Sequence, residues 1–171
     1  MLDSGVFQGQ AFELIDGELI DKMGQNPPHS SGVQLVMIRL IAIFGATRIR
    51  VQSSIEVAKS DAERSWPEPD VIVLAEAKPD YRTRHPNGDE LLLLVEVADT
   101  TLRYDATTKR DLYARAGVPE CWVLDVNGRQ LIVHRNPIQG HYEHIATLSE
   151  NDTVSLQSRP DASVSVAELL P

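Results

Sequence analysis

The chain has 171 residues, of which 42% are hydrophobic and 24% charged, so it has the length of one domain and can bury a core. Its formal net charge of −9 argues against a protein that coats DNA regardless of sequence, because phosphate binding depends on clustered Lys and Arg, but it does not exclude a nuclease. No apolar stretch approaches the roughly 20 residues of a membrane helix. The first residues, MLDSGVFQGQ, lack the features of a signal peptide, and the single Cys121 fits a reducing compartment. We therefore expect a single cytoplasmic domain over residues 1–171.

The first predicted element is a hairpin in the segment FELIDGELIDKM, residues 12–23. Two short apolar–polar runs flank Asp16-Gly17, and Asp-Gly is a strong signal for a tight turn between antiparallel strands. Glu18 follows this turn directly. Most acids in such a position are solvent-exposed, so the simpler interpretation is an exposed hairpin acid. The alternative is that Glu18 belongs to a site.

A loop and then an amphipathic helix follow the hairpin. The segment GQNPPHSSG predicts a loop, in which Ser30 or Ser31 would cap the helix. Apolar residues recur at three- and four-residue steps from Val33 to Phe44, which predicts a helix with one core-facing side. His29, in the loop, could bind phosphate or metal, although a single loop histidine more often does neither.

The next strands are predicted in residues 48–57 and 67–74. RIRVQSSIEV favours one strand or two, and PEPDVIVL favours a strand with its prolines at the entrance. In the second segment Asp70 shares one side with Ile72 and Leu74, while Val71 and Val73 share the other. Asp70 therefore opens a strand that is apolar on both faces.

Residues 75–90 predict a long polar loop that carries the densest basic patch of the chain. The patch consists of Lys78, Arg82, Arg84 and His85. A solvated loop is the simpler interpretation, and a contact with nucleic acid is the alternative.

The segment Leu91–Val97, LLLLVEV, predicts a strand covered on both faces, with Glu96 near its end. Asp105 is a suitable N-cap for a helix over residues 106–116. Lys109 falls on the apolar side of that helix, which is unusual for a lysine. Either its ammonium reaches back to water from the first helical turn, or it faces a site.

A second buried strand, CWVLD, follows the helix. Asn127-Gly128 then predicts a hairpin into the strand QLIVHR, and HYEHIATL predicts a further strand. The closing VSVAELLP predicts a short strand or turn and then one helical turn. The fold class is therefore α/β, with a central mixed β-sheet flanked by helices.

Three charged groups, Asp70, Glu96 and Lys109, each open or close an otherwise apolar element. Because an unpaired buried carboxylate is costly, such groups are usually paired or bound to a metal. Two carboxylates from adjacent strands make an oxygen-rich site suited to Mg²⁺ or Mn²⁺. A lysine beside them could orient or deprotonate a water, or neutralise charge on a phosphate. These are the parts needed to hydrolyse a phosphodiester bond.

The chain resembles the Uma-two family within the PD-(D/E)XK restriction-endonuclease-like superfamily. The resemblance covers nearly the whole chain through FELIDGELI, PEPDVIVL, LLLLVEVADTTLRYDATTKRDLYARAGVPECWVLD and VSVAELL, of which the long central segment is the most specific. It implies the restriction-endonuclease-like fold for this domain.

By this resemblance Asp70 and Glu96 are the two acids that hold the metal, together with the backbone carbonyl of Val97. The superfamily usually places its lysine two positions after the second acid, where this chain has Ala98. The resemblance implies that Lys109 replaces it from the following helix. Glu18 would match an acid that some superfamily members supply from an early element.

The expected activity is a metal-dependent endonuclease that uses Mg²⁺ or Mn²⁺ and acts on DNA rather than RNA, as a homodimer. One alternative is a non-enzymatic domain on the same fold that binds nucleic acid or a protein. A further alternative is a purely structural ion-pair network of Asp70, Glu96 and Lys109. Under that interpretation a Lys109→Met variant would fold as well as the wild type or better.

Overall fold

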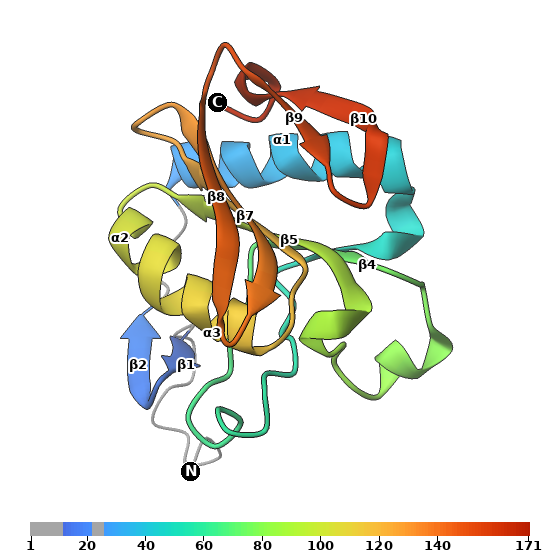
Figure 1. The fold of residues 1–171 in the computed structure, drawn as a ribbon, viewed down its shortest axis with the longest axis vertical. Helices are drawn as coiled ribbons and strands as arrows, with labels where there is room; N and C mark the ends of the chain where they lie inside the picture. The colour runs from blue at the N-terminus through green and yellow to red at the C-terminus, as the bar shows by residue number, and fades with distance from the viewer. Residues whose placement is uncertain (1–11, 22–25) are drawn as a thin grey trace.

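The computed structural model describes residues 12–21 and 26–171. Its centre is a six-stranded sheet in the order β3-β4-β5-β6-β7-β8. Helix α1 covers one face, and the helical segment that ends in α3 covers the other (Figure 1). The strands are β3 (Ile49–Val51), β4 (Val71–Leu74), β5 (Leu91–Ala98), β6 (Glu120–Asp125), β7 (Gln130–Ile138) and β8 (His141–Ser149). Strands β5 and β6 pair in parallel and all other neighbours antiparallel, so the predicted α/β class with a mixed sheet is confirmed.

The N-terminal hairpin has the predicted turn. Strands β1 (Phe12–Ile15) and β2 (Glu18–Asp21) pair antiparallel across Asp16 and Gly17, whose φ angles are 49° and 87°. Positive φ at both central positions is what a two-residue hairpin turn of type I′ requires. The Trp66 amide donates to the Leu14 carbonyl, which joins this separate two-stranded sheet to the segment before β4.

Helix α1 (Pro27–Phe44) begins earlier than the sequence predicts. Its cap is Asn26, whose side chain accepts from the His29 amide, so the prediction of a Ser30 or Ser31 cap is wrong. The two prolines in the predicted loop occupy the first helical positions, where an amide hydrogen has no helical partner and proline is tolerated. His29 therefore lies on the first turn of a helix rather than in a loop.

Strand alternation divides the core as expected. Val71, Val73, Leu93 and Val95 pack toward α1, with the small hairpin of β9 (Thr153–Leu156) and β10 (Arg159–Ser165) on the same side. Ile72, Leu74 and Leu94 pack on the opposite face with Tyr113. Both faces of β4 and β5 are therefore buried, as the apolar runs predict.

The helical segment after β5 begins before the predicted residue and contains an irregular turn. It consists of α2 (Leu102–Tyr104), a π-helical turn (Asp105–Lys109) and α3 (Arg110–Arg115). Asp105 has helical backbone angles and a buried side chain, so the prediction of an Asp105 N-cap is wrong. Its carboxylate is satisfied inside the fold, because it accepts from the Thr101 hydroxyl and faces Lys109. Single π turns within helices occur often at functional sites.

Two other predicted boundaries shift. Strand β3 covers only Ile49–Val51 of the one or two strands predicted in residues 48–57, and β7 extends beyond the predicted strand QLIVHR to Ile138. The segment VSVAELLP contains a 3₁₀ turn (Val166–Glu168), which corresponds to the helical turn predicted there. Among the helices in the described residues, none is long and apolar enough to cross a membrane.

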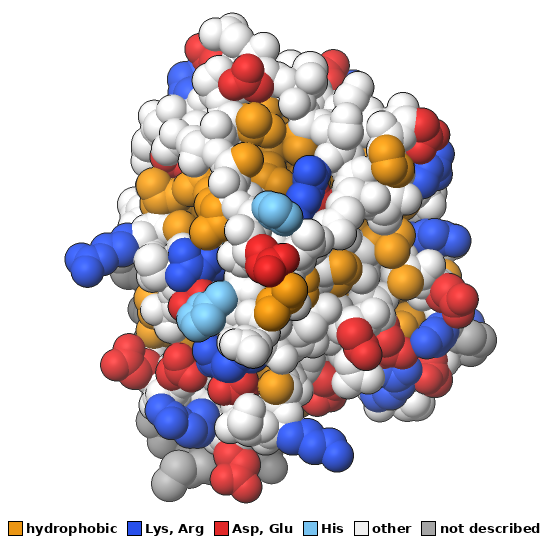
Figure 2. All heavy atoms as spheres, in the orientation of Figure 1, with side chains coloured by type: hydrophobic (Ala, Val, Ile, Leu, Met, Phe, Trp, Pro, Cys, Tyr) orange, Lys and Arg blue, Asp and Glu red, His pale blue; other side chains and the backbone are white. Residues whose placement is uncertain are grey.

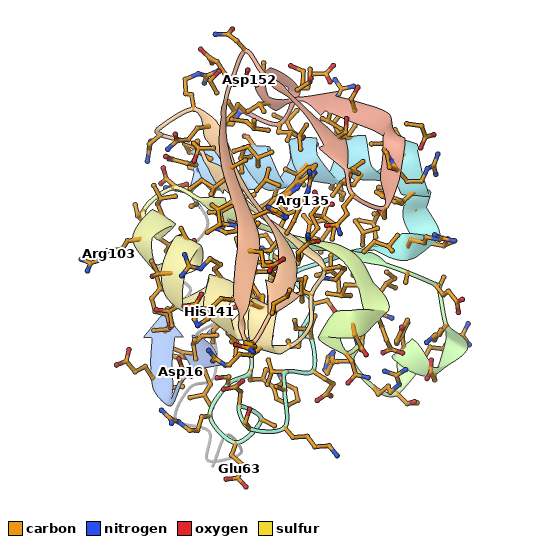
Figure 3. All side chains as sticks on the ribbon, viewed as in Figure 1. Asp16, Glu63, Arg103, Arg135, His141 and Asp152 are labelled. Atoms are coloured by element: carbon orange, nitrogen blue, oxygen red, sulfur yellow. The ribbon has the colours of Figure 1, made fainter. Side chains whose placement is uncertain are left out.

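The β9–β10 hairpin is attached to the central sheet through a buried acid. Glu120 on β6 has no exposed surface and accepts from the Trp122 indole, the Arg135 guanidinium and the Gln157 amide. Figure 3 shows Arg135 between β7 and this hairpin. Because the carboxylate has several donors, its burial is compensated.

Candidate functional site

Asp70 is held between α1 and β5, immediately before β4. The register pairs Val71 with Val95, so Asp70 comes next to Glu96 across the two strands. Its Oδ2 accepts from the Val97 amide at 2.8 Å and lies 3.1 Å from Nε2 of His29. The hydrogen bond between Asp70 and His29 raises the pKa of His29 above its ordinary value. The structure thus brings His29 to one of the predicted site acids.

Glu96 is buried at the end of β5, with 3% of its surface exposed. Its Oε1 lies 3.2 Å from Nζ of Lys109 and accepts from the Tyr113 hydroxyl. Burial raises the pKa of Glu96 to about 8; Lys109 opposes this, and the neighbouring carboxylates add to it. Near neutral pH the site therefore favours a proton or a further cation close to this carboxyl group.

Lys109 is surrounded by carboxylates from three elements. Its Nζ lies 2.7 Å from Glu13, 3.2 Å from Glu96 and 3.7 Å from Asp105. Burial acts to lower the pKa of Lys109, but these three acids outweigh it and hold the pKa well above the ordinary value. Only 7% of the side chain is exposed, so the alternative in which the ammonium reaches bulk water is excluded.

The early acid that joins this cluster is Glu13 on β1. Its Oε2 contacts Lys109, and its Oε1 accepts from the Glu68 amide at 2.6 Å. Glu18 lies exposed on β2, so the structure does not bring that predicted site residue to Lys109. The strand pattern contains a usable signal, because Glu13 shares one side of β1 with the buried Ile15.

Tyr113 is a further site residue that the sequence reasoning did not single out. It is fully buried, and burial raises the pKa of its hydroxyl well above the ordinary value, so it remains a donor to Glu96. Its position four residues after Lys109, on the same side of the helix, is the signal that could have identified it.

The donor set suits a hard divalent cation. The carboxylates of Asp70 and Glu96 and the carbonyl of Val97 are all oxygen donors, which Mg²⁺ and Mn²⁺ prefer. Among the described residues, no three His, Cys, Asp or Glu side chains form a ready metal cluster. The protein would therefore supply two carboxylates and one carbonyl, with water completing the shell, as is usual for Mg²⁺. Lys109 is one positive charge among several carboxylates, and a divalent cation would offset the remaining negative charge.

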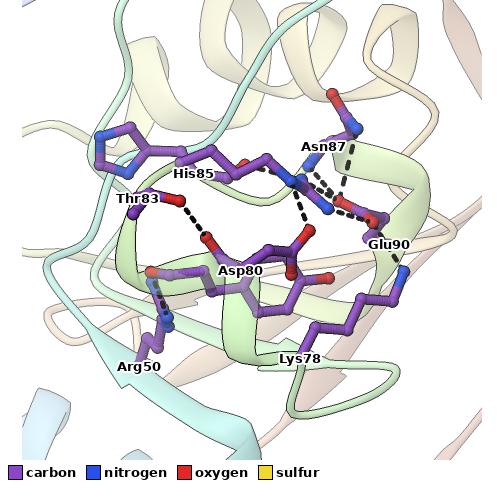
Figure 4. A network of polar contacts seen from close by, with 9 residues as sticks. Arg50, Lys78, Asp80, Thr83, His85, Asn87 and Glu90 are labelled. Carbon is purple, nitrogen blue, oxygen red and sulfur yellow. Dashed lines mark hydrogen bonds and ion pairs between the residues drawn. The ribbon is translucent and has the colours of Figure 1, made fainter.

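The basic loop at residues 75–90 is largely neutralised by its own acids. Glu90 pairs with Lys78 at 2.8 Å and with Arg84 at 2.7 Å, and Arg84 also pairs with Asp80 (Figure 4). The Arg50 guanidinium donates to the carbonyl of Tyr81. This network favours a structural role for the loop over an open phosphate-binding patch.

A mixed sheet flanked by helices, with one acid immediately before β4, a second on β5 and a lysine beside it, is consistent with the restriction-endonuclease-like class. A family model described as "Putative restriction endonuclease", Uma2, matches residues 2–167, so the chain belongs to this family. It is the Uma-two family whose motifs the sequence resembles.

A solved structure shows the same fold. It is the crystal structure of a protein from Anabaena variabilis described as a "putative nuclease belonging to DUF820". The TM-score is 0.71 and the identity 16%, over 93% of this chain and 89% of that chain. At this identity the likeness establishes the fold and not the activity. No curated protein matched the sequence.

Proposed function

We propose that the protein is a divalent-metal-dependent endonuclease that hydrolyses phosphodiester bonds in DNA. The observation that carries the proposal is the placement of Asp70 next to Glu96 across β4 and β5, with the Lys109 ammonium 3.2 Å from Glu96. Asp70, Glu96 and the Val97 carbonyl would hold Mg²⁺ or Mn²⁺. When bound, the metal supplies Lewis-acid polarisation of a phosphoryl oxygen and lowers the pKa of water.

Lys109 would act as a charged donor in this mechanism. Because neighbouring acids hold its pKa high, it keeps its proton near neutral pH and orients a water molecule instead of deprotonating it. Its contacts with Glu13 and Asp105 fix the ammonium beside Glu96. Tyr113, which donates to Glu96, and His29, which pairs with Asp70, would position the two carboxylates.

The proposed assembly is a homodimer, for which the central sheet offers an exposed edge. Strand β8 is at the edge of the sheet, where Ile145 is 55% exposed. Figure 2 shows apolar side chains on this face between interspersed acidic and basic ones, without an extended basic tract. An exposed, partly apolar edge strand is a surface that a second copy could cover.

A nicking assay tests the function. Supercoiled plasmid is incubated with the protein and Mg²⁺ or Mn²⁺, with the variant Glu96→Gln and with Glu150→Gln as a surface-acid control. We expect nicking that requires the metal, is unchanged in the control and falls by about 100-fold or more in Glu96→Gln. Circular dichroism confirms that each variant is folded. Equal nicking by the wild type and Glu96→Gln would sink the proposal.

The second candidate is a catalytically silent domain that binds nucleic acid or a protein. It is favoured by the engagement of Lys109 with three carboxylates within 3.7 Å, which is also how a structural ion network is built. Calorimetric titration with Mn²⁺ separates the two candidates. Metal binding that is lost in Asp70→Asn supports the nuclease, and the absence of binding to the wild type supports the silent domain.

A further inference from the structure

Trp66 is an exposed aromatic residue held in a fixed orientation on the segment before β4. It is 47% exposed, whereas the other tryptophan, Trp122, is completely buried. Its amide donates to Leu14, and its indole Nε1 donates to Ser54 Oγ at 3.0 Å. The ring of His85 meets it edge to face, with 5.6 Å between the ring centroids. An aromatic ring fixed in this way loses little conformational freedom when a flat ligand covers it.

The backbone that carries Trp66 leads directly to the site. In the sequence WPEPD the two prolines are buried and restrict the backbone; Trp66 is exposed at one end of the segment, and Asp70 is buried at the other. The Glu68 amide donates to Glu13, a contact of Lys109. Four residues of extended chain span at most about 13 Å. Trp66 and Asp70 are therefore no further apart than about four steps of a stacked nucleic-acid strand, at roughly 3.4 Å each.

Charge makes an aromatic contact especially useful in this protein. The net charge is −9, and Lys78 and Arg84 of the basic loop are paired with acids. These two cations of the loop are therefore less available for phosphate contacts, which normally dominate the affinity for nucleic acid. Stacking of a base on an aromatic ring does not need a cation and contributes substantially to the binding of single strands.

We infer that Trp66 is a stacking platform for an unpaired base, and that the substrate is DNA that is single-stranded or locally unpaired near the cleaved bond. The inference rests on the proposed nuclease function, because it uses the position of Trp66 relative to Asp70. A base inside an intact duplex is covered by its neighbours, so a strand must be open for the indole to reach it.

Fluorescence and anisotropy test the platform with the full chain in EDTA, where metal-dependent cleavage cannot occur. The probe is a twelve-residue oligothymidylate, about the site size of small single-strand binders. We expect saturable quenching of wild-type tryptophan fluorescence, and none in Trp66→Phe, where the buried Trp122 is the remaining fluorophore. With a labelled probe, Trp66→Ala should bind roughly 5- to 150-fold more weakly, while Trp66→Phe should lose less because it keeps a ring.

Ile38→Ala, an exposed apolar truncation on α1, is the matched control and should bind like the wild type. Equal binding by the wild type, Trp66→Phe and Trp66→Ala overturns the platform, as does a wild type that does not bind the oligonucleotide. Tighter binding to an intact duplex of the same length overturns the substrate class. The nicking assay is read separately: metal-dependent nicking with unchanged binding by Trp66→Ala removes the platform alone, and absent nicking removes the nuclease function.

Discussion

Replacing Lys109 by Met removes a buried ammonium while keeping an unbranched, apolar side chain. The Nζ atom lies 2.7, 3.2 and 3.7 Å from the carboxylates of Glu13, Glu96 and Asp105. At an effective dielectric constant of about 20, each contact corresponds to a gross attraction of about 5 kcal/mol, most of which desolvation offsets. Removing one partner from such a buried network costs about 3–5 kcal/mol, because the remaining acids lose their counter-charge. We expect this loss in the free energy of unfolding at about pH 8 and above, where Glu96 ionises.

The pKa shifts of the neighbouring acids determine whether the stability loss of Lys109→Met grows or shrinks with pH. Burial raises the pKa of Glu96 from 4.5 to about 8, so its stabilising contribution is complete below about pH 4.5 and is lost as the pH rises through about 8. Lys109 opposes the raised pKa of both Glu96 and Asp105. Without it both pKa values rise further, and the folded state retains protons that the unfolded state releases. The deficit of Lys109→Met should therefore be largest above about pH 8 and shrink toward about pH 5.

Urea unfolding followed by tryptophan fluorescence, from about pH 5 to about pH 8.5, measures this effect. Lys78→Met is the matched control, because Lys78 also pairs with a glutamate but has a half-exposed side chain; its unfolding midpoint should stay close to that of the wild type. If Lys109→Met were as stable as the wild type across the pH range, the cluster would not depend on the ammonium, and the reasoning would be refuted.

Three further variants test the contacts around the site and the sheet. Tyr113→Phe removes the donor to Glu96 and should lower the free energy of unfolding by about 1–3 kcal/mol, measured by urea unfolding. Because the ionised form of Glu96 loses this donor, the acidic limb of the nicking profile should shift to higher pH in a pH series of the nicking assay. Glu120→Ala leaves several buried donors unpaired and should cost about 3–5 kcal/mol in the same unfolding assay. Gly88→Ala would place Cβ 2.4 Å from the backbone oxygen of Ala116; the resulting shift should cost about 1–3 kcal/mol and lower the thermal midpoint.

Glu150→Ala is the common control for these variants, because Glu150 forms a surface pair with Arg129. It should change the unfolding free energy by no more than about 1 kcal/mol. A wild-type midpoint in Glu120→Ala or Gly88→Ala would contradict the described packing at that position. An unchanged pH profile in Tyr113→Phe would contradict the coupling between Tyr113 and Glu96.

Local chemistry was sufficient to predict the elements whose pattern has one explanation. Asp16-Gly17 predicts a tight turn because few other residue pairs adopt positive φ twice, and the structure has that turn. Apolar residues on both sides of β4 and β5 predict burial on both faces, which the two cores confirm. Each of these signals lies within a few residues, so it can be interpreted without knowledge of the tertiary fold.

The prediction failed where a residue has two permissible uses. The prolines before His29 suit a loop and also the first helical turn, and the structure uses them in the helix. Asp105 is a good N-cap by type but is buried within the helical segment, because Thr101 and Lys109 satisfy it there. Rules based on residue type do not predict whether a carboxylate will cap the end of a helix or accept from side chains such as Thr101 and Lys109.

The site was predictable in part, because buried charge is conspicuous in an apolar run. Glu96 and Lys109 stand out by sequence, and the structure places them 3.2 Å apart. Glu13 reaches the same ammonium because the hairpin docks beside the segment before β4. No local pattern sets that docking, and only the family resemblance pointed to Glu18, which follows the turn and is exposed.

The π-helical turn at Asp105–Lys109 gives the chain one place where its length can change at little cost to the fold. A π turn contains an additional residue compared with an α-helical turn, and it holds that residue by widening. Deleting one residue within it would restore regular helix while α3 keeps the same side toward the sheet. Deleting one residue within α3 would instead rotate every residue beyond it by about 100° about the helix axis. The helical segment is therefore expected to tolerate a deletion in the π turn better than one in α3.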